Sequence, residues 1–451
     1  MALLKELLKL GLPLLVSMAA IVGLGVTDTI MAGLASTQDL AALAVGSSLY
    51  LIPLMLLIGL LSVVAPRVSW QLGAGRSASL RSDCWQSMWM GLFVGLVTML
   101  LVLAAMRFLP LLKLEAGVET VARHYLSIVV VSLPLLGVSL GLRNTIDGLG
   151  YPVMNMWVSI GCLLLNALLD YLFVFGKFGF PKLGAVGCAI ATVGVVLLQI
   201  VAPALITYCH KEIKRYRLLS AFIAPEFSTL KTLFALGLPA AFAVTLEECF
   251  FSSTSLLVAP MGTTPLAAHQ VVLNIAMVAL IFPIAMGQAA AILIGRALGT
   301  GEPATAANQS RIFLLVLLIM TLFCSVLMLL VRDTLMSLFT DDAAVIVLGS
   351  GLLLIVSFQL IVDGIQIGSN IALKGYQDTF IPALLQLFSY WIVGFPLAVA
   401  LTRTQWFGTP GGVESVWYAL FAGLTVASIL GAWRLFYISG QFASGNRVLA
   451  T

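Results

Sequence analysis

The chain has few charged residues and little of the chemistry that most soluble enzymes use. Only 9% of its 451 residues are Asp, Glu, Lys or Arg, and its three histidines, at positions 124, 210 and 269, are scattered. The six cysteines form no CxxC pair, so we interpret them as small buried hydrophobic residues. The sequence contains no nucleophile elbow, phosphate-binding loop or cluster of metal ligands. We therefore expect neither an enzyme nor a protein with a bound cofactor.

Apolar sequence is what the chain has in abundance. Hydrophobic residues make up 61% of it. The apolar runs are continuous and do not alternate in ten-residue segments, which excludes a membrane β-barrel. Windows of ~20 apolar residues give twelve spans, beginning near residues 10, 43, 85, 123, 152, 185, 232, 266, 311, 345, 379 and 416. The sequence thus predicts an all-α polytopic membrane protein that lies in the lipid bilayer.

The basic residues predict how the chain is oriented. The first span follows Lys5 and Lys9 and runs past Asp28 without a small-residue cleavage site, so we expect a retained helix. Of the 23 Lys and Arg residues, 16 lie in the termini and even-numbered loops. Basic loops stay on the cytoplasmic side, so both termini are expected in the cytoplasm, with the protein in the cell (inner) membrane. The net charge of +4 follows from this bias and gives no reason to expect nucleic acid as a partner.

The chain repeats itself at a shift of 226 residues. This shift places Gly11-Leu12-Pro13 on Gly237-Leu238-Pro239 and Leu40-Ala41-Ala42 on Leu266-Ala267-Ala268. An even number of spans in each half makes the repeats parallel, so we expect two pseudo-twofold six-helix bundles around a central cleft. The predicted divisions are an N-terminal bundle over 1–207, a cytoplasmic linker over 208–231 and a C-terminal bundle over 232–451.

Five carboxylates interrupt the apolar sequence and are the best candidates for function: Asp28, Asp170, Glu247, Glu248 and Asp363. A charge deep in a bilayer costs at least ~2.5–3.5 kcal/mol, so such residues usually mark an ion or substrate path. None has an acidic counterpart at the repeat shift. A carboxylate needed for shared architecture would be expected in both halves, so the asymmetry favours specific chemistry in each half.

The spacing of these residues predicts two sites. Asn166 precedes Asp170 by four residues and shares its helix face. Together with Asp28 they predict an oxygen-rich pocket for Na⁺ or a shared proton, or alternatively a hydrogen-bonded clamp between helices. Glu247 and Glu248 are neighbours, ~100° apart around their helix, so they cannot point the same way. Glu248 is an accessory candidate, either a ligand or the partner of a neighbouring helix.

Several segments, in this order, resemble the multidrug and toxic compound extrusion (MATE) family, closest to its NorM branch. The resemblance covers nearly the whole chain and rests on GVTDTIMAGL, DLAALAVGSS, LNALLDYLFVFG, AVGCAIATV, LVAPMGTTPLAAHQVVLN and ALKGYQD. It implies a secondary transporter that exports bulky cationic or amphipathic small molecules in exchange for Na⁺ or H⁺. A monomer is expected.

The resemblance also implies which residues couple the ion. By position in the matching segments these are Asp28, Asn166, Asp170, Thr192, Glu247 and Asp363. Na⁺ is expected either at Glu247 and Asp363 or at Asp28, Asn166 and Asp170. Glu248 departs from the NorM pattern and leaves open which of the two glutamates faces the cation.

The sequence also leaves two other functions open. A flippase for lipid-linked or other amphipathic substrates of the same superfamily would share the duplicated bundle, but anionic headgroups would call for basic residues within the spans. A passive channel would want a ring of equivalent acids, which the repeat does not supply.

Overall fold

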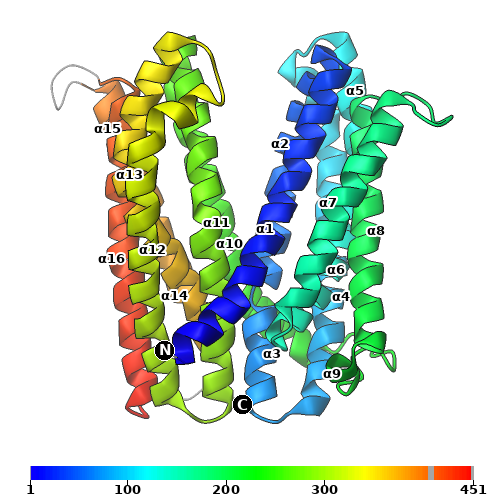
Figure 1. The fold of residues 1–451 in the computed structure, drawn as a ribbon, viewed down its shortest axis with the longest axis vertical. Coiled ribbons are helices and arrows are strands. Elements are labelled where there is room, and N and C mark those ends of the chain that lie inside the picture. The colour runs from blue at the N-terminus through cyan, green and yellow to red at the C-terminus, as the bar shows by residue number, and fades with distance from the viewer. Residues whose placement is uncertain (1, 405–410, 448–451) are drawn as a thin grey trace. The chain divides into compact units, whose positions relative to one another are not determined.

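The computed structural model describes residues 2–404 and 411–447, and this part of the chain is helical without a strand (Figure 1). The α-helices are α1 (Ala2–Ala35), α2 (Thr37–Leu61), α3 (Val64–Gly73), α4 (Ser77–Ala105), α5 (Ala116–Val129), α6 (Ser132–Gly148), α7 (Pro152–Phe175), α8 (Ala185–Cys209), α9 (Lys211–Lys214), α10 (Phe227–Val258), α11 (Thr263–Gly299), α12 (Pro303–Ser337), α13 (Ala343–Leu373), α14 (Phe380–Leu387), α15 (Phe395–Arg403) and α16 (Val413–Ala443). Short 3₁₀ segments cover Met106–Leu112, Ala259–Met261 and Lys374–Tyr376, and a π-helical segment covers Phe388–Gly394.

Eleven stretches of helix in the described residues are long and apolar enough to cross a membrane. A twelfth span is formed by α5 and α6 together, which are bent by 40° where they meet. Pro134 accounts for the break, because a proline ring clashes with the carbonyl four residues earlier, here that of Val130. The prediction of twelve spans is therefore confirmed when the bent pair counts as one.

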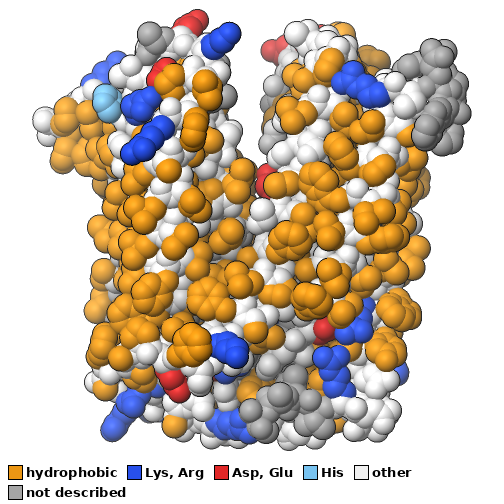
Figure 2. Space-filling model, turned by 180° about the vertical axis from the view of Figure 1, so that it is seen from behind, with side chains coloured by type: hydrophobic (Ala, Val, Ile, Leu, Met, Phe, Trp, Pro, Cys, Tyr) orange, Lys and Arg blue, Asp and Glu red, His pale blue; other side chains and the backbone are white. Residues whose placement is uncertain are grey.

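The exposed surface of the helices is apolar in the way a bilayer requires. On α4, Leu100 and Leu101 are 61% and 62% exposed, and on α12 Leu330 is 78% exposed. Figure 2 shows hydrophobic side chains over the middle of the helices and Lys and Arg side chains gathered toward their ends. A soluble protein rarely carries so much exposed apolar surface, whereas lipid tails cover it favourably.

The chain forms two compact units, and the boundaries between them fall within helices. The amino-terminal unit is Val16–Ala241, and the carboxyl-terminal unit contains residues 2–15 together with the described part of 242–451. The two division points, after Leu15 in α1 and after Ala241 in α10, are separated by the same 226 residues that relate the sequence repeats. The predicted domain limits at 207 and 232 stay a prediction.

Two glycines of the repeated Gly-Leu-Pro motif make equivalent contacts in the two units. In the carboxyl-terminal unit, Gly11 of α1 packs so closely on Met286 of α11 that a Cβ atom would overlap the methionine. In the amino-terminal unit, a Cβ atom on Gly237 of α10 would lie 2.6 Å from the carbonyl oxygen of Leu60 in α2. Since residues 60 and 286 are also 226 apart, the repeat extends from sequence to packing.

Helices α4 and α6 of the amino-terminal unit approach each other backbone to backbone. Gly91 and Gly95 lie one turn apart on α4, and Gly137 and Gly141 lie one turn apart on α6. A Cβ atom on Gly91 or Gly137 would overlap the backbone of the other residue. This is the small-residue packing by which membrane helices gain van der Waals contact without a hydrophobic driving force.

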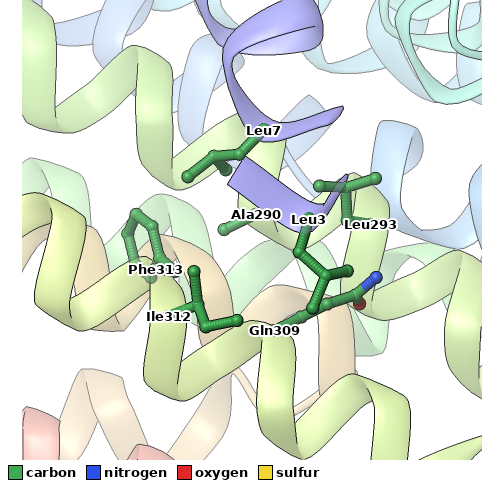
Figure 3. Close-up of a pocket in the computed structure, with 7 residues that line it drawn as sticks. All are labelled: Leu3, Leu7, Ala290, Leu293, Gln309, Ile312 and Phe313. Carbon is green, nitrogen blue, oxygen red and sulfur yellow. The ribbon is translucent and has the colours of Figure 1, made fainter. Parts of the chain in front are cut away.

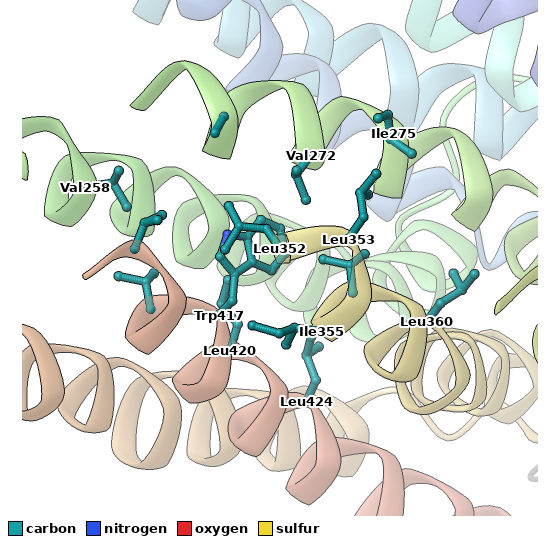
Figure 4. Close-up of a cluster of buried hydrophobic side chains, with 14 of the residues drawn as sticks. Val258, Val272, Ile275, Leu352, Leu353, Ile355, Leu360, Trp417, Leu420 and Leu424 are labelled. Atoms are coloured by element: carbon teal, nitrogen blue, oxygen red, sulfur yellow. The ribbon is translucent and has the colours of Figure 1, made fainter. Parts of the chain in front are cut away.

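A buried apolar cluster in the carboxyl-terminal unit holds α13 in place (Figure 4). Leu352 of α13 and Trp417, Leu420 and Leu424 of α16 are fully buried in it, and Val272 of α11 contributes from a third helix. Because Asp363 lies on the same α13, this core fixes the helix that carries one of the predicted site residues.

We expect Gly91→Ala to destabilise the protein because the backbone of Gly137 cannot move aside as a flexible side chain can. Overpacking of this kind costs about 1–3 kcal/mol, which lowers the melting temperature of the detergent-solubilised protein by several degrees. Gly440→Ala on α16 is the matched control, since its Cβ atom would meet nothing within 4 Å. Equal melting temperatures for the two variants would contradict the close helix crossing.

Candidate functional site

The first candidate site lies in the amino-terminal unit and begins with α7. This helix starts with Pro152, whose fixed backbone angle suits a first helical position, and ends at Gly176 in a left-handed conformation (φ 67°). Asn166 and Asp170 lie one turn apart on its buried face and are 1% and 0% exposed. The sequence prediction that they share a face is confirmed.

The structure brings Asp28 and Thr192 to these two residues. The Asn166 side chain donates a hydrogen bond from Nδ2 to Oδ1 of Asp28, at 3.0 Å, and so joins α7 to α1. The Thr192 hydroxyl on α8 lies close enough to the Asp28 carboxylate to interact with it, and it donates to the Cys188 carbonyl oxygen at 2.9 Å. We call Asp28, Asn166, Asp170 and Thr192 the N-terminal acid site.

Several oxygens of the N-terminal acid site are buried without a partner. Among the described residues, neither carboxylate oxygen of Asp170 nor Oδ1 of Asn166 accepts a hydrogen bond. A buried polar atom left in this state costs about 1–3 kcal/mol, and a carboxylate charge costs more. Chemically, the arrangement suits a proton shared between carboxylates or a small cation that the free oxygens would bind.

Cys188 is a neighbour of this site that the sequence analysis missed. Its Sγ atom and carboxylate oxygens of Asp28 and Asp170 lie within 4.8 Å of one another. Cys188 is fully buried, as expected for a small hydrophobic residue, but it is buried among acids. Its spacing in the sequence could have indicated this position, because Cys188 precedes Thr192 by four residues and so shares that residue's face of α8.

The second candidate site lies in the carboxyl-terminal unit around Glu247 of α10. Tyr390 donates a hydrogen bond from Oη to Oε1 of Glu247 at 3.4 Å, and Gln386 donates from Nε2 to Oε2 at 3.5 Å. Both bonds are long and therefore weak individually. Trp391 adds a bond from Nε1 to the Leu246 carbonyl oxygen at 3.3 Å, so α10 is held along one side of the Glu247 turn.

The π-helical segment explains how Tyr390 reaches Glu247. It covers Phe388–Gly394 and is followed by Pro396, whose ring disturbs the normal bond to the carbonyl of Ile392. The ring of Tyr390 stacks on that of Phe250 in α10, with centroids 4.9 Å apart and parallel planes. Neither Tyr390 nor Gln386 was expected from the sequence, because nothing in the local pattern ties them to α10.

Asp363 completes this second group. It is 3% exposed on α13, and its Oδ1 atom has no hydrogen-bond partner among the described residues. It lies near enough to Glu247 for the two carboxylates to repel each other, and Lys374 lies within electrostatic reach of Glu247. We call Glu247 and Asp363, with Gln386 and Tyr390, the C-terminal acid site.

Glu248 is placed apart from these contacts. Its side chain is half-buried and makes no hydrogen bond or ion pair within residues 2–404 and 411–447. Of the two neighbouring glutamates, Glu247 is therefore the one that contacts other polar side chains of the site.

A small apolar pocket in the carboxyl-terminal unit lies between the start of α1, α11 and α12 (Figure 3). Its cavity volume is only about 10 Å³, and it is lined by Leu3, Leu7, Ala290, Leu293, Gln309, Ile312 and Phe313. Pockets that bury a drug-sized molecule usually measure ~300–1,000 Å³ and offer several polar groups. This pocket is too small and too uniform to replace the acid sites as the candidate for function.

Twelve apolar spans, an internal repeat and ionisable groups within the spans define an integral membrane protein of the transporter class. The chain belongs to the MATE family, because the family model MatE matches residues 13–172 and 239–400. The two matched segments start at the two prolines of the repeated Gly-Leu-Pro motif. The family resemblance found in the sequence is confirmed.

Curated relatives match over almost their full length. A probable multidrug resistance protein NorM of Shewanella oneidensis is 32% identical over 96% of this chain and 95% of its own. A second probable multidrug resistance protein NorM, from Mannheimia succiniciproducens, is 34% identical over 97% and 94%.

Solved structures share the fold at low sequence identity. The eukaryotic MATE transporter AtDTX14 superposes with a TM-score of 0.87 at 19% identity, covering 99% of both chains. A MOP superfamily transporter from Pyrococcus furiosus gives 0.85 at 18% identity, covering 97% and 96%, and a reverse polarity of its binding pocket suggests a different function for it. The shared fold therefore leaves the substrate to be argued from the side chains.

We expect Tyr390→Ala to destabilise the protein strongly and Tyr390→Phe only slightly. The alanine variant loses a fully buried ring stacked on Phe250, at a cost of about 3–5 kcal/mol, whereas phenylalanine keeps the stack and loses one long hydrogen bond worth about 1 kcal/mol or less. Thermal unfolding in detergent measures both. Similar melting temperatures for the two variants would show that the stack does not hold α10.

Proposed function

We propose that the protein is an antiporter that exports bulky organic cations and amphipathic drugs by alternating access, in exchange for Na⁺ or H⁺. The observation that carries this proposal is the pair of acid sites, one in each unit, whose buried carboxylates include oxygens without partners. The NorM relatives are multidrug resistance proteins by name, which supports the same substrate class.

Competition for the N-terminal acid site supplies the coupling. Asp28 and Asp170 lie close together in a low-dielectric setting, so a proton or a Na⁺ ion relieves their repulsion. The positive group of an organic cation relieves the same repulsion. Substrate and coupling ion therefore bind with opposed effects on each other, and by reciprocity the inward ion gradient drives release of the substrate outward.

The C-terminal acid site offers a second, different cation site. Glu247 and Asp363 supply the charge, while Tyr390 and Gln386 orient the Glu247 carboxylate from the π-helical segment and α14. Glu248 stays an accessory candidate, and Na⁺ at Glu247 and Asp363 remains part of the proposal. Because this site also contains a phenol and an amide, its preference among cations differs from that of the N-terminal acid site.

The same proposal includes a setting for the protein. We place it in the cell (inner) membrane as a monomer with both termini in the cytoplasm, since most basic residues lie in the termini and even-numbered loops.

Replacing each acid by its neutral isostere tests the proposal. We expect Asp170→Asn and Asp363→Asn, each with shape preserved, to reduce ethidium efflux from cells at least tenfold, because each change removes one of the two carboxylates that attract ion and substrate at its site. Glu248→Gln is the matched control and should retain efflux, since Glu248 lies outside both hydrogen-bonded groups. Unchanged efflux in both acid variants, at equal expression, would sink the acid-site mechanism.

Reconstitution identifies the coupling ion. In proteoliposomes we expect addition of an organic cation to release either Na⁺ or H⁺, and an imposed gradient of that ion to drive uptake of the cation. A substrate flux without any coupled ion would instead favour a flippase for amphipathic substrates or a channel.

A further inference from the structure

We propose that the N-terminal acid site also binds a thiophilic divalent cation, such as Zn²⁺ or Cd²⁺, through Asp28, Asp170 and Cys188. The ligand atoms of these three residues lie within 4.8 Å of one another. They come from three different helices, α1, α7 and α8, so the group is formed by the folded unit and not by one stretch of sequence.

The spacing suits a small metal ion after a modest adjustment. Zinc binds sulfur at ~2.3 Å and oxygen at ~2.0–2.2 Å, so ligand atoms around one tetrahedral ion are roughly 3.3–3.8 Å apart. To bring the three ligand atoms from their present spacing, within 4.8 Å, to that of a bound ion, side chains must move by about 1 Å. Asp28 is the residue that can make this movement, because it is half-buried whereas Asp170 and Cys188 are fully buried.

A second, independent observation points to a missing ligand. Both carboxylate oxygens of Asp170 and Oδ1 of Asn166 are buried and accept no hydrogen bond from the described residues. Asn166 also donates through Nδ2 to Oδ1 of Asp28, as an outer partner of a ligand does in metal sites. The amide oxygen of Asn166 is then available as a fourth ligand.

Sulfur decides which cations this group prefers. Na⁺ and Mg²⁺ bind oxygen and gain little from a thiol, whereas Zn²⁺ and Cd²⁺ bind a thiolate strongly. On binding, the Cys188 thiol loses its proton to water as the metal–sulfur bond forms, and the two carboxylates offset the charge of the ion. The metal would occupy the oxygens that the proposed coupling ion uses, but the binding itself does not depend on that transport role.

Cadmium titration of the purified full chain in detergent tests the proposal directly. A cadmium–thiolate bond gives a charge-transfer absorption in the ultraviolet, and we expect this band to saturate at one Cd²⁺ per chain. The exposed Cys209 can bind the ion alone, so the titration uses a Cys209→Ser background. Cys188→Ala should remove the saturable band, and Asp170→Asn should weaken binding at least tenfold.

Cys162→Ala is the matched control, because Cys162 is also a fully buried thiol of the amino-terminal unit but contacts the Val195 carbonyl instead of an acid. It should leave the band unchanged. Persistence of the band in Cys188→Ala, or its loss in Cys162→Ala, would overturn the assignment, as would the absence of saturable binding in the background protein.

A second readout covers a variant that folds poorly. Zn²⁺ should raise the melting temperature of the background protein by several degrees, and it should not do so for Cys188→Ser, which keeps the size of the side chain. Equal stabilisation of both proteins would refute the metal site even if ethidium efflux still required Asp170.

Discussion

Hydrocarbon offers no water to a polar group, and this single constraint governs both the architecture and the sites. Backbone groups meet it by forming helices, and Ser and Thr hydroxyls meet it by bonding carbonyls within the same helix, as Thr321 does to Leu317. Carboxylates have no such local solution. Asp170 and Asp363 are two buried carboxylates with oxygens that have no partner among the described residues, and apolar clusters hold the helices that carry them.

The features that follow from this constraint were readable in the sequence. Continuous apolar runs predicted the spans, and acids within them predicted where the sites lie, because both signals depend on the local cost of placing a residue in lipid. The spacing of Asn166 and Asp170 predicted their shared face, and the structure adds the bond from Asn166 to Asp28 on another helix. The coupling roles of these residues stay a prediction.

Contacts between distant segments were not predictable from one sequence. The sequence predicts Cys188 to be an ordinary small buried residue because it belongs to no CxxC pair, and its acidic neighbours come from other helices. Tyr390 reaches Glu247 from a π-helical segment, which shifts the helix face by an amount that regular helical spacing does not give, and Gln386 reaches it from the end of α14 just before that segment. The four-residue spacing of the glycines at 91 and 95 and at 137 and 141 is visible in the sequence. Only the structure shows that these two helices pack against each other.

The first residues of α1 pack in the carboxyl-terminal unit, and the first residues of α10 pack in the amino-terminal unit. This arrangement affects when each segment meets its packing partners during synthesis. Residues 2–15 leave the ribosome first, yet Gly11 packs against α11, which belongs to the second half of the chain. Residues 227–241, by contrast, emerge when their partners in α2 are already in place. The two repeats are thus alike in the finished molecule but unlike during assembly: the amino-terminal segment stays without its packing partners until α11 has been made, while its counterpart docks at once.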